Sequence, residues 1–330
     1  MQAAVQTAYG APDVVVVRDI PKPVPGEDEV LVRIVATTVT SGDARLRAFR
    51  VPAAFWLPAR LFLGIRKPKR AILGSEFSGE IEAIGRDVRR FRIGDRVFGM
   101  QVYGAHAQYK IVPETAALTT MPDNLDFNEA AALPFGATTA LYFLQRAKIQ
   151  PGARVLVYGA SGAVGCFGVQ LARHFGAHVT AVTSTGNMGL MRELGADAVI
   201  DYKTTDFART GARYDVVMDT VNRVSFAQFR KIAAPGACLL AVDAGGGMFL
   251  RAGLARLLRG PRIIVGMATE TLADLETIRS LAQSGAIRAT IDSTLPLARI
   301  AEAHALVDSG RKRGAAVITV AEARPGVPAS

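Results

Sequence analysis

The stretch from Val155 to Gly176, VLVYGASGAVGCFGVQLARHFG, decides the fold of this chain. It contains a short apolar run, a turn with glycines at 159, 162 and 165, and a helical pattern that Gly176 closes. A second apolar run follows at 179–182. A strand that enters a helix through such a turn allows backbone N–H groups to approach a pyrophosphate at the helix N-terminus. The stretch therefore predicts a dinucleotide-binding strand–turn–helix unit, the alternative being a glycine-rich turn that binds no ligand.

Most residues of the turn have an expected role in dinucleotide binding. Gly162 would let the chain come close to the phosphates, and Gly165 would let the helix pack tightly on its strand. The N–H groups that follow Gly162 would donate to the pyrophosphate. The predicted cofactor-binding residues of the turn are Gly159, Ser161, Gly162, Ala163, Val164 and Gly165.

The residues after the second strand bear on the choice between NADPH and NADH. An acid about 20 residues beyond the turn normally binds the ribose 2′-hydroxyl of NAD, but residues 182–187, VTSTGN, contain none. A carboxylate would repel a 2′-phosphate, whereas hydroxyls and an amide can donate to one, so NADPH is predicted. The predicted donors are Thr183, Ser184 and Asn187, with Arg192, Tyr202 and Lys203 as outer candidates. Arg192 and Lys203 could equally be solvated surface residues.

Length and composition limit the class of protein. A chain of 330 residues that is 50% apolar is expected to be globular with two domains. No run of 18 apolar residues is present, and the N-terminus lacks the pattern of a secretory signal. The two cysteines, Cys166 and Cys238, suit a reducing compartment and exclude a multi-cysteine metal site. We therefore expect a cytoplasmic protein.

The net charge of +10 is concentrated in two segments without acids. Residues 44–75 interleave arginines and lysines with Phe, Trp and Leu, and residues 248–269 place arginines among leucines. Such segments form a solvated face over a packed one or a lid over a pocket, and less often contact anionic membranes. No nucleic-acid partner is expected, because no recognition motif accompanies the charge.

The hydrophobic pattern changes along the chain. Up to about residue 115 it predicts strands separated by turns, an all-β pattern whose strands include 14–17, 29–35, 77–84 and 96–99. A helix is expected over 128–144, with a proline at 134. Strands and helices then alternate, as in a parallel sheet covered by helices, at 154–158, 164–175, 179–182, 188–194, 198–202, 215–219, 226–233 and 238–242. A helix at 272–284 and strands at 291–297 and 316–320 follow.

Several motifs occur in a fixed order along nearly the whole chain. They are GSEFSG at 74–79, GDRVFG at 94–99, GAHAQY at 104–109, AAALP at 130–134 with Thr138-Thr139, Asp292 with Pro296-Leu297, Ala303-His304, and GRKRG at 310–314. This ordered set resembles the medium-chain dehydrogenase/reductases, and within them the zinc-free quinone-oxidoreductase-like branch.

The resemblance implies an α/β fold with a GroES-like β-rich catalytic domain plus a Rossmann doubly wound parallel sheet. The first domain would comprise residues 1–122 and 268–330 and the second residues 123–267, with the cofactor in the cleft. The resemblance further implies that Thr139 lines the nicotinamide side, that Val221 packs near the adenosine, and that Lys312 reaches the cofactor. A solvated lysine in a basic turn is the alternative for Lys312.

The resemblance also shows where this chain departs from zinc-dependent relatives. Those hold zinc with a Cys of the first catalytic segment, a His in a Gly-His-Glu motif, and a further Cys or acid. Here residues 39–43 contain no thiol, Ser75 occupies the His position, and the four-cysteine lobe is missing. Because Ser41, Asp43, Ser75 and Glu76 offer neither thiolate nor imidazole, no metal is expected.

Without a Lewis acid, reversible alcohol oxidation is the less natural reaction. Hydride transfer from NADPH to a quinone or an α,β-unsaturated carbonyl mainly requires positioning and a hydrogen bond to the developing oxygen charge. The candidate donors are Thr40, Ser41 and Tyr103, although a hydroxyl there can equally serve a turn. His106 and His304 are expected to be structural.

The sequence thus predicts a zinc-independent, NADPH-dependent quinone or enone reductase. A homodimer is expected from the resemblance, paired through an edge strand at 263–266. Two alternatives stay open. One is a zinc-free alcohol/aldehyde oxidoreductase on the same fold. The other is a non-catalytic nucleotide-binding protein that docks on membranes or partners.

Overall fold

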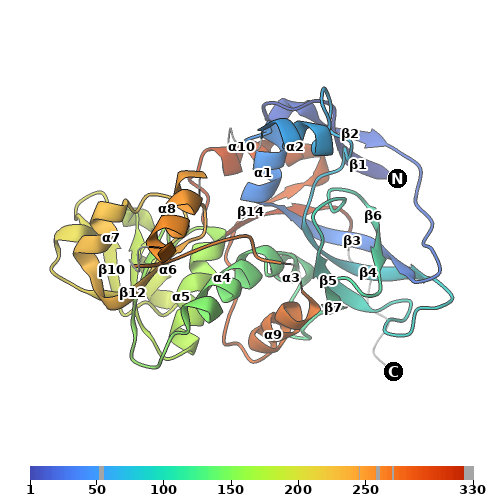
Figure 1. Ribbon diagram of the computed structural model, residues 1–330. Coiled ribbons are helices and arrows are strands. Elements are labelled where there is room, and N and C mark those ends of the chain that lie inside the picture. The colour runs from blue at the N-terminus through green and yellow to red at the C-terminus, as the bar shows by residue number, and fades with distance from the viewer. Residues whose placement is uncertain (52–55, 245, 258–260, 270, 323–330) are drawn as a thin grey trace. The chain divides into compact units, whose positions relative to one another are not determined.

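The computed structural model describes residues 1–51, 56–244, 246–257, 261–269 and 271–322 (Figure 1). The chain forms two compact units. The first unit comprises Met1–Phe135, Glu270–Gln283 and Ala289–Ser330, and the second comprises Gly136–Thr269 and Ser284–Arg288. The predicted combination of a β-rich domain and a parallel-sheet α/β domain is present in these two units.

The first unit is built on β-sheets. A two-stranded antiparallel sheet pairs β1 (Gln2–Gln6) with β2 (Val15–Asp19). The larger sheet has the order β14 (Ile291–Pro296), β15 (Ala315–Thr319), β3 (Glu29–Val39), β4 (Glu76–Ile84), β5 (Arg96–Met100) and β7 (Leu118–Thr120), with β6 (Tyr109–Pro113) paired to β3. Strand β3 is buried along nearly its whole length, as expected for a central strand covered on both faces.

Two helices interrupt the part of the first unit that the sequence predicted to be all-β. They are α1 (Ser41–Ala48) and α2 (Trp56–Leu63). A capping box in which Thr40 and Asp43 bond each other's backbone N–H opens α1, and Phe49, in the left-handed region at φ 50°, closes it. The all-β prediction was wrong at this point because the local capping chemistry of residues 40–43 outweighed the surrounding strand pattern.

The remaining helices of the first unit are α3 (Phe127–Ala131), α9 (Leu272–Gln283) and α10 (Ile300–Asp308). The helix predicted at 128–144 is divided into α3 and α4 (Pro134–Ala147). Proline has no N–H to donate and a φ already suited to the first helical turn, so it opens a new helix rather than continuing the old one.

The second unit contains a six-stranded sheet in which every pair is parallel. Its order is β10 (Ala198–Asp201), β9 (His178–Thr183), β8 (Arg154–Tyr158), β11 (Tyr214–Asp219), β12 (Ala233–Ala241) and β13 (Arg262–Val265). From β8 the chain adds strands outward on one side, through β9 to β10, and from β11 it adds them outward on the other side, through β12 to β13. The strand order therefore reverses between β8 and β11. A ligand crevice forms outside the carboxyl ends of the strands at such a switch point.

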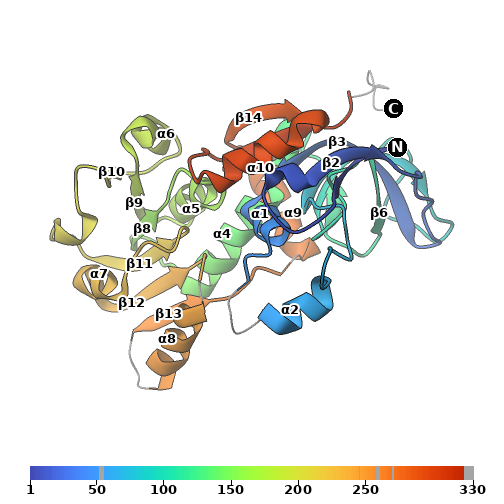
Figure 2. The same ribbon diagram turned by 90° about the horizontal axis from the view of Figure 1, so that it is seen from above.

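Helix α4 precedes the first strand of the second unit, and four further helices follow strands of the sheet in the chain (Figures 1 and 2). These four are α5 (Ala163–His174), α6 (Met188–Glu193), α7 (Phe226–Ile232) and α8 (Gly246–Leu257). One apolar core of this unit joins Leu156, Val217, Leu239 and the buried face of α7 around Phe229. The predicted alternation of strands and helices is therefore present in this unit.

The unit boundaries differ from the predicted 122/123 and 267/268. Residues up to Phe135 belong to the first unit because α3 packs on its sheet, where Ala131 and Ala132 join Ala36 and Val317 in one apolar cluster. Residues 284–288 return to the second unit, where the Arg288 N–H donates to Gln170 Oε1 at 2.8 Å.

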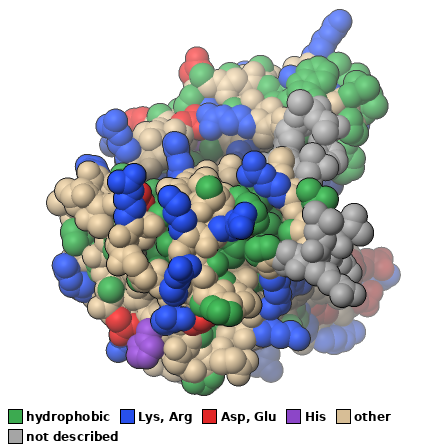
Figure 3. Space-filling view, turned by 60° about the vertical axis from the view of Figure 1, so that its left-hand side comes forward, with side chains coloured by type: hydrophobic (Ala, Val, Ile, Leu, Met, Phe, Trp, Pro, Cys, Tyr) green, Lys and Arg blue, Asp and Glu red, His purple; other side chains and the backbone are tan. Residues whose placement is uncertain are grey.

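The surface is rich in basic side chains. Figure 3 shows a face on which lysines and arginines are spread among hydrophobic side chains and acidic groups are sparse, consistent with the net charge of +10. None of the described helices combines the length and hydrophobicity required to cross a bilayer. Residues 52–55 and 258–260, parts of the two acid-free segments, lie outside the described residues.

Candidate dinucleotide and catalytic sites

The glycine turn of the second unit has the geometry that its sequence predicts. Gly159 has φ +74°, and a Cβ there would lie 2.6 Å from Thr220 Oγ1. A Cβ on Gly165 would lie 2.3 Å from the Gly159 carbonyl oxygen, so only glycine lets α5 pack against the turn. A Cβ on Gly162, by contrast, would meet only the Gly159 carbonyl oxygen at 3.5 Å. The three glycines therefore act differently, and of the three only Gly162 has room for a Cβ.

The N-terminus of α5 is suited to an anion. Gly162 is its N-cap and no side chain caps the helix, so the N–H groups of Ala163 and Val164 point out of the first turn. Backbone N–H groups and the helix dipole together favour a phosphate group at this position. The residues present thus fit the pyrophosphate of a dinucleotide.

The structure brings together two of the predicted ribose-side donors, Ser184 and Asn187, with Ser161 of the glycine turn. Asn187 Nδ2 donates to Ser161 Oγ at 3.1 Å and to Ser184 Oγ at 3.2 Å. Ser161 comes from the glycine turn, whereas the other two follow β9, so the cluster joins the two loops at the carboxyl edge of the sheet. Thr183 is different, since its hydroxyl is buried and has no hydrogen-bond partner within the described ranges.

Asp201 is a residue of this region that sequence reasoning missed. It ends β10 in register with Thr183, and its carboxylate accepts hydrogen bonds from Thr185 Oγ1 (2.5 Å) and the Lys203 N–H (2.9 Å). The Thr185 bond and then the Lys203 bond hold the pKa of Asp201 below its usual value. Although residues 182–187 contain no acid, the neighbouring strand supplies one, and the turn to Tyr202 and Lys203 starts there.

A second missed acid organises the loop after β11. The Asp219 carboxylate is buried and accepts hydrogen bonds from the N–H groups of Val221 (3.1 Å) and Val224 (2.7 Å). Burial raises the pKa of Asp219, against the effect of these backbone bonds. Val221, predicted to lie near the adenosine, is partly exposed at the start of this loop. The sequence signal that could have identified Asp219 is its position as an acid at the carboxyl end of a buried strand.

Helix α4 packs beside the glycine turn within the second unit. A Cβ on Gly136 would lie 2.8 Å from the Ala163 carbonyl oxygen and from the Phe167 ring, so the two helices approach closely at this glycine. Thr139, one turn further along α4, is buried. The structure thus places Thr139 on the helix that contacts the first turn of α5.

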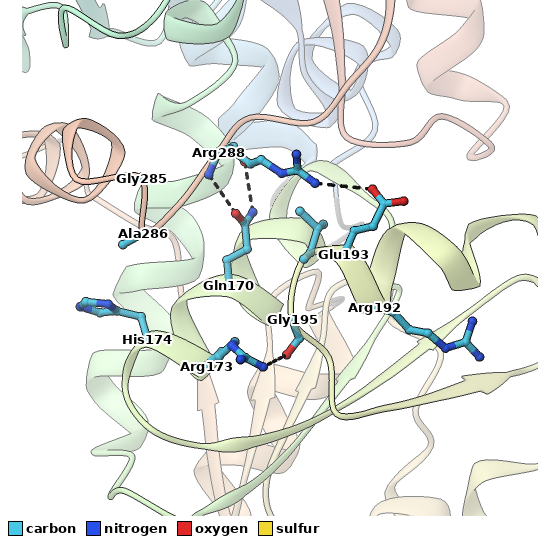
Figure 4. Close-up of a pocket in the computed structure, with 10 residues that line it drawn as sticks. Gln170, Arg173, His174, Arg192, Glu193, Gly195, Gly285, Ala286 and Arg288 are labelled. Carbon is cyan, nitrogen blue, oxygen red and sulfur yellow. Dashed lines mark hydrogen bonds and ion pairs between the residues drawn. The ribbon is translucent and has the colours of Figure 1, made fainter.

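A hollow of about 470 Å³ lies elsewhere on the second unit (Figure 4). It is lined by basic side chains that include Arg173, Arg192 and Arg288, and Arg288 pairs with Glu193 at 3.5 Å. Arg173 and His174 end α5, a helix of 12 residues and thus about 18 Å long. The hollow is therefore at the opposite end of α5 from the glycine turn, and Arg192, an outer candidate for the ribose phosphate, lines it.

In the first unit, the Asp43 carboxylate joins α1 to the turn before β4. Its Oδ2 accepts hydrogen bonds from the Thr40 N–H (2.8 Å) and Thr40 Oγ1 (2.6 Å), and its Oδ1 accepts one from the Gly74 N–H (3.1 Å). Thr40 Oγ1 also lies 3.4 Å from Ser75 Oγ. Thr40, a predicted donor to substrate, therefore directs its hydroxyl proton towards Asp43.

Glu76 is the most perturbed carboxyl of this cluster. It is buried, accepts a hydrogen bond from the Phe135 N–H at 2.6 Å, and is bonded by the Thr38 hydroxyl. Burial raises the pKa of Glu76 to about 7, despite these bonds and the nearby charge of Lys312. The sequence pointed to Glu76 only as a poor zinc ligand and gave no sign of this role.

The other predicted residues of the first unit are more accessible. Ser41 is exposed in the first turn of α1, and Tyr103 is half-buried with the Arg70 guanidinium 5.4 Å from its ring. Burial raises the pKa of Tyr103, so its hydroxyl keeps its proton. The Lys312 ammonium donates to the Gly314 carbonyl and lies close enough to Glu76 to lower the pKa of that carboxyl.

Two buried histidines lie beyond this cluster. His106 Nε2 is 2.9 Å from the Thr38 carbonyl oxygen, and its ring contacts that of His304 edge to face at 5.7 Å. Burial lowers the pKa of both, that of His304 to about 2. Nowhere in the described ranges do three His, Cys, Asp or Glu side chains meet in an arrangement that could hold a metal ion. The side chains expected at the zinc-ligand positions, those of Ser41, Asp43, Ser75 and Glu76, include no thiolate and no imidazole, at least one of which the usual zinc sites contain.

Comparison with known proteins agrees with this architecture. Residues 26–123 match the family model of the alcohol dehydrogenase GroES-like domain, and residues 194–318 match the model of the zinc-binding dehydrogenases. The chain is 31% identical to the 2-methylene-furan-3-one reductase of Solanum lycopersicum, over 96% of this chain and 79% of that protein.

Two further proteins are quinone oxidoreductases by name. That of Pseudomonas aeruginosa is 30% identical over 94% of this chain and 97% of its own length. The structure of the enzyme from Coxiella burnetii superposes with a TM-score of 0.85 at 25% identity, covering 97% of this chain and 99% of that one. This chain belongs to the medium-chain dehydrogenase/reductase superfamily, in its quinone-oxidoreductase-like branch.

Proposed function

We propose that the protein is a metal-independent, NADPH-dependent reductase of quinones or α,β-unsaturated carbonyl compounds. The observation that carries the proposal is the donor set of the first unit. Where the resemblance places the metal ligands of zinc-dependent relatives, this chain has no thiol or imidazole, and Asp43, Ser75 and Glu76 are bonded to Thr40 or to backbone. A reduction that needs no Lewis acid suits such a site better than alcohol oxidation does.

Two of the similar proteins support this reaction class. One is named for reduction of a 2-methylene-furan-3-one, in which a carbon–carbon double bond is conjugated to a ketone, and another for reduction of quinones. Both kinds of acceptor take a hydride and develop negative charge on oxygen. The chemical requirement on the protein is therefore a positioned hydrogen-bond donor near that oxygen.

The second unit has the groups to hold the cofactor, which would supply the hydride. The N–H groups of Ala163 and Val164 would donate to the pyrophosphate, with Gly162 allowing its close approach. Ser161, Ser184 and Asn187 already form one cluster and would bind the ribose 2′-phosphate. The proposed preference for NADPH rests on this cluster. The nearby carboxylate of Asp201 would oppose a 2′-phosphate, but it already accepts hydrogen bonds from Thr185 and from the Lys203 N–H.

Among the three candidate donors we favour Tyr103. Thr40 donates its hydroxyl proton to Asp43, and Ser41 is exposed to water that would compete for any hydrogen bond. Tyr103 is half-buried and stays protonated, and the Arg70 guanidinium beside it would stabilise negative charge on a nearby oxygen. Solvent can then supply the final proton.

An acceptor panel tests the proposal. Purified protein is mixed with NADPH or NADH and with a quinone, a conjugated enone or a saturated aldehyde, and cofactor oxidation is followed by absorbance. We expect turnover of the quinone or the enone with NADPH, unchanged by a zinc chelator. Turnover of the aldehyde alone would instead assign the protein to alcohol/aldehyde interconversion.

We also propose a homodimer that pairs through β13. This strand is the edge of the parallel sheet and contains Ile263, Ile264 and Val265, all only partly buried. An apolar edge strand with unpaired backbone groups favours pairing with a second copy. Sedimentation of the purified protein at several concentrations should give twice the 35.0 kDa mass of one chain.

A further inference from the structure

Helix α2 of the first unit exposes its apolar side. Leu57, Leu61 and Phe62 are 63%, 58% and 79% exposed, and none of the residues of the helix is buried. A helix on the surface of a globular domain normally turns its apolar stripe towards the core and its charges towards water. In Figure 2 this helix extends away from the strands of its own unit.

The half-buried side of α2 comprises Ala59, Arg60 and Leu63, and Arg60 contacts aromatic rings of the unit. The Arg60 guanidinium lies over three aromatic rings, 3.9 Å from that of Phe49, 4.7 Å from that of Tyr9 and 5.2 Å from that of Trp56. Its Nη1 also donates to the Ile65 carbonyl oxygen at 3.0 Å. Arg60 therefore fixes the helix with its apolar face outward.

The loop that follows α2 is strongly basic. Arg66, Lys67, Lys69 and Arg70 are all exposed, as is Ile65, and residues 44–75 contain no acid. Lys69 Nζ donates to the Leu61 carbonyl oxygen at 2.9 Å, which keeps this loop against the end of the helix. Exposed apolar side chains and uncompensated cations thus lie next to each other on one segment, 56–70.

We propose that segment 56–70 is a docking surface for an anionic lipid bilayer. Leucine and phenylalanine side chains would enter the boundary between headgroups and acyl chains, where Arg66 and Lys67 would pair with lipid phosphates. Trp56, half-exposed at the start of α2, is a residue type that favours this boundary.

The charge of the segment favours a membrane over a second copy of the chain. A symmetric pairing of two such segments would bring their cations together without any acid from residues 44–75 to compensate, and each chain already carries a net charge of +10. An anionic bilayer compensates that charge and also accepts the apolar side chains.

The chain contains a built-in reporter, because Trp56 is its one tryptophan. Vesicles of phosphatidylcholine, alone or mixed in equal amounts with phosphatidylglycerol, are added to the full-length protein at low salt. With the anionic vesicles we expect a blue shift of the Trp56 emission, quenching by brominated lipid, and co-sedimentation. Phosphatidylcholine alone, or added salt, should abolish all three, because salt screens exposed charges.

Two sets of variants separate the apolar and charged contributions. Leu57→Gln/Leu61→Gln/Phe62→Gln and Arg66→Gln/Lys67→Gln should each weaken binding to anionic vesicles by at least about tenfold. The matched controls, Val24→Gln/Ile93→Gln and Arg18→Gln/Arg92→Gln, change exposed residues outside segment 56–70 and should stay within about twofold of the wild type.

The same measurements can overturn the proposal. An unchanged Trp56 emission with anionic vesicles would do so, as would control variants that lose binding as strongly as the segment 56–70 variants. If the apolar variant instead changes the sedimenting mass of the protein in the absence of lipid, the face binds a second copy. If it alters only the KM for the acceptor, the face belongs to the substrate site.

Discussion

The carboxylate of Glu76 accepts a hydrogen bond of 2.6 Å from the backbone N–H of Phe135, in the first turn of α4. Glu76, the first residue of β4, thus connects that strand to the helix that leads into the second unit. A negative charge at a helix N-terminus is favourable, but burial of the carboxylate opposes it. Burial has the larger effect, since the pKa of Glu76 is raised to about 7.

This raised pKa predicts how stability depends on pH. The pKa of Glu76 is about 7 in the folded protein, above its ordinary value of 4.5. The protonated carboxyl therefore contributes fully to stability below pH 4.5, and this contribution is lost as pH rises through 7. Glu76→Gln keeps an acceptor for Phe135 and removes the titration. Above pH 8 we expect the variant to be more stable than the wild type by roughly 3 kcal/mol, and at pH 5 the gap should be much smaller.

Urea unfolding at pH 5, 6, 7 and 8 measures this difference. Glu27→Gln, which removes an exposed carboxylate paired with Arg86, is the control and should keep the pH dependence of the wild type. A wild-type profile retained by Glu76→Gln would show that this carboxyl does not titrate in the predicted range.

His304 predicts the opposite dependence at acid pH. Burial, and then the charges of His106 and Arg47, lower the pKa of His304 from 6.5 to about 2. Below pH 6.5 the imidazole of His304 is protonated in the unfolded chain but stays neutral in the folded protein. The free energy of unfolding therefore decreases by about 1.4 kcal/mol for each pH unit below 6.5. His304→Leu should remove this part of the acid sensitivity.

Thermal melting at pH 5 and pH 7.5 compares the two proteins. The loss on moving to pH 5 should be smaller in His304→Leu by about 2 kcal/mol. His178→Gln, a change at an exposed imidazole, should leave the loss unaltered. Equal losses in all three proteins would contradict a buried neutral His304.

The glycines of the turn predict two separable phenotypes. Gly162→Ala adds a Cβ that contacts only the Gly159 carbonyl oxygen at 3.5 Å, so stability should change by less than about 1 kcal/mol. The same methyl would enter the space predicted for the pyrophosphate, and NADPH affinity should fall by at least about tenfold. Gly165→Ala would place a Cβ 2.3 Å from that oxygen and should destabilise the fold by about 1–3 kcal/mol.

Fluorescence titration with NADPH and chemical denaturation, done on both variants, distinguish these effects. If Gly162→Ala binds NADPH as tightly as the wild type, the pyrophosphate does not lie over this residue.

Cofactor choice can be reversed at Ser184. Ser184→Asp would place a carboxylate in the Ser161–Ser184–Asn187 cluster, where it would repel a 2′-phosphate and accept a bond from a 2′-hydroxyl. The ratio of kcat/KM for NADPH to that for NADH should fall by about tenfold or more. Ser184→Asn, of similar size without the charge, is the control. A ratio unchanged by the aspartate would place the ribose elsewhere.

The proton-donor candidates predict different losses. Tyr103→Phe removes a half-buried hydroxyl and should lower kcat by about ten- to a hundredfold, with NADPH affinity unchanged. Ser41→Ala, at an exposed position, should have little effect. Steady-state kinetics with a quinone or an enone measures both, and the reverse order of effects would favour Ser41 as the donor.

The sequence alone determined most of the second unit. Its strands and helices alternate with clear periods, and the glycine turn at 159–165 needs particular backbone geometry, so both can be inferred from neighbouring residues. The β-rich nature of the first unit was equally readable, but α1 and α2 were not. The Thr40–Asp43 capping box was a visible signal for α1, whereas α2 exposes its apolar side and so lacks the usual pattern of a surface helix.

The tertiary structure decided the surroundings of each functional group. Asp201 reaches the region of Thr183 from the neighbouring strand, and Asp219 organises the backbone of the loop that contains Val221. Glu76 acquires its raised pKa only because residues distant in sequence bury it. Local patterns determine strands, turns and caps, because these depend on adjacent residues. Burial, charge neighbours and the direction that a helix faces depend on residues far apart in the chain, and only the folded structure brings those together.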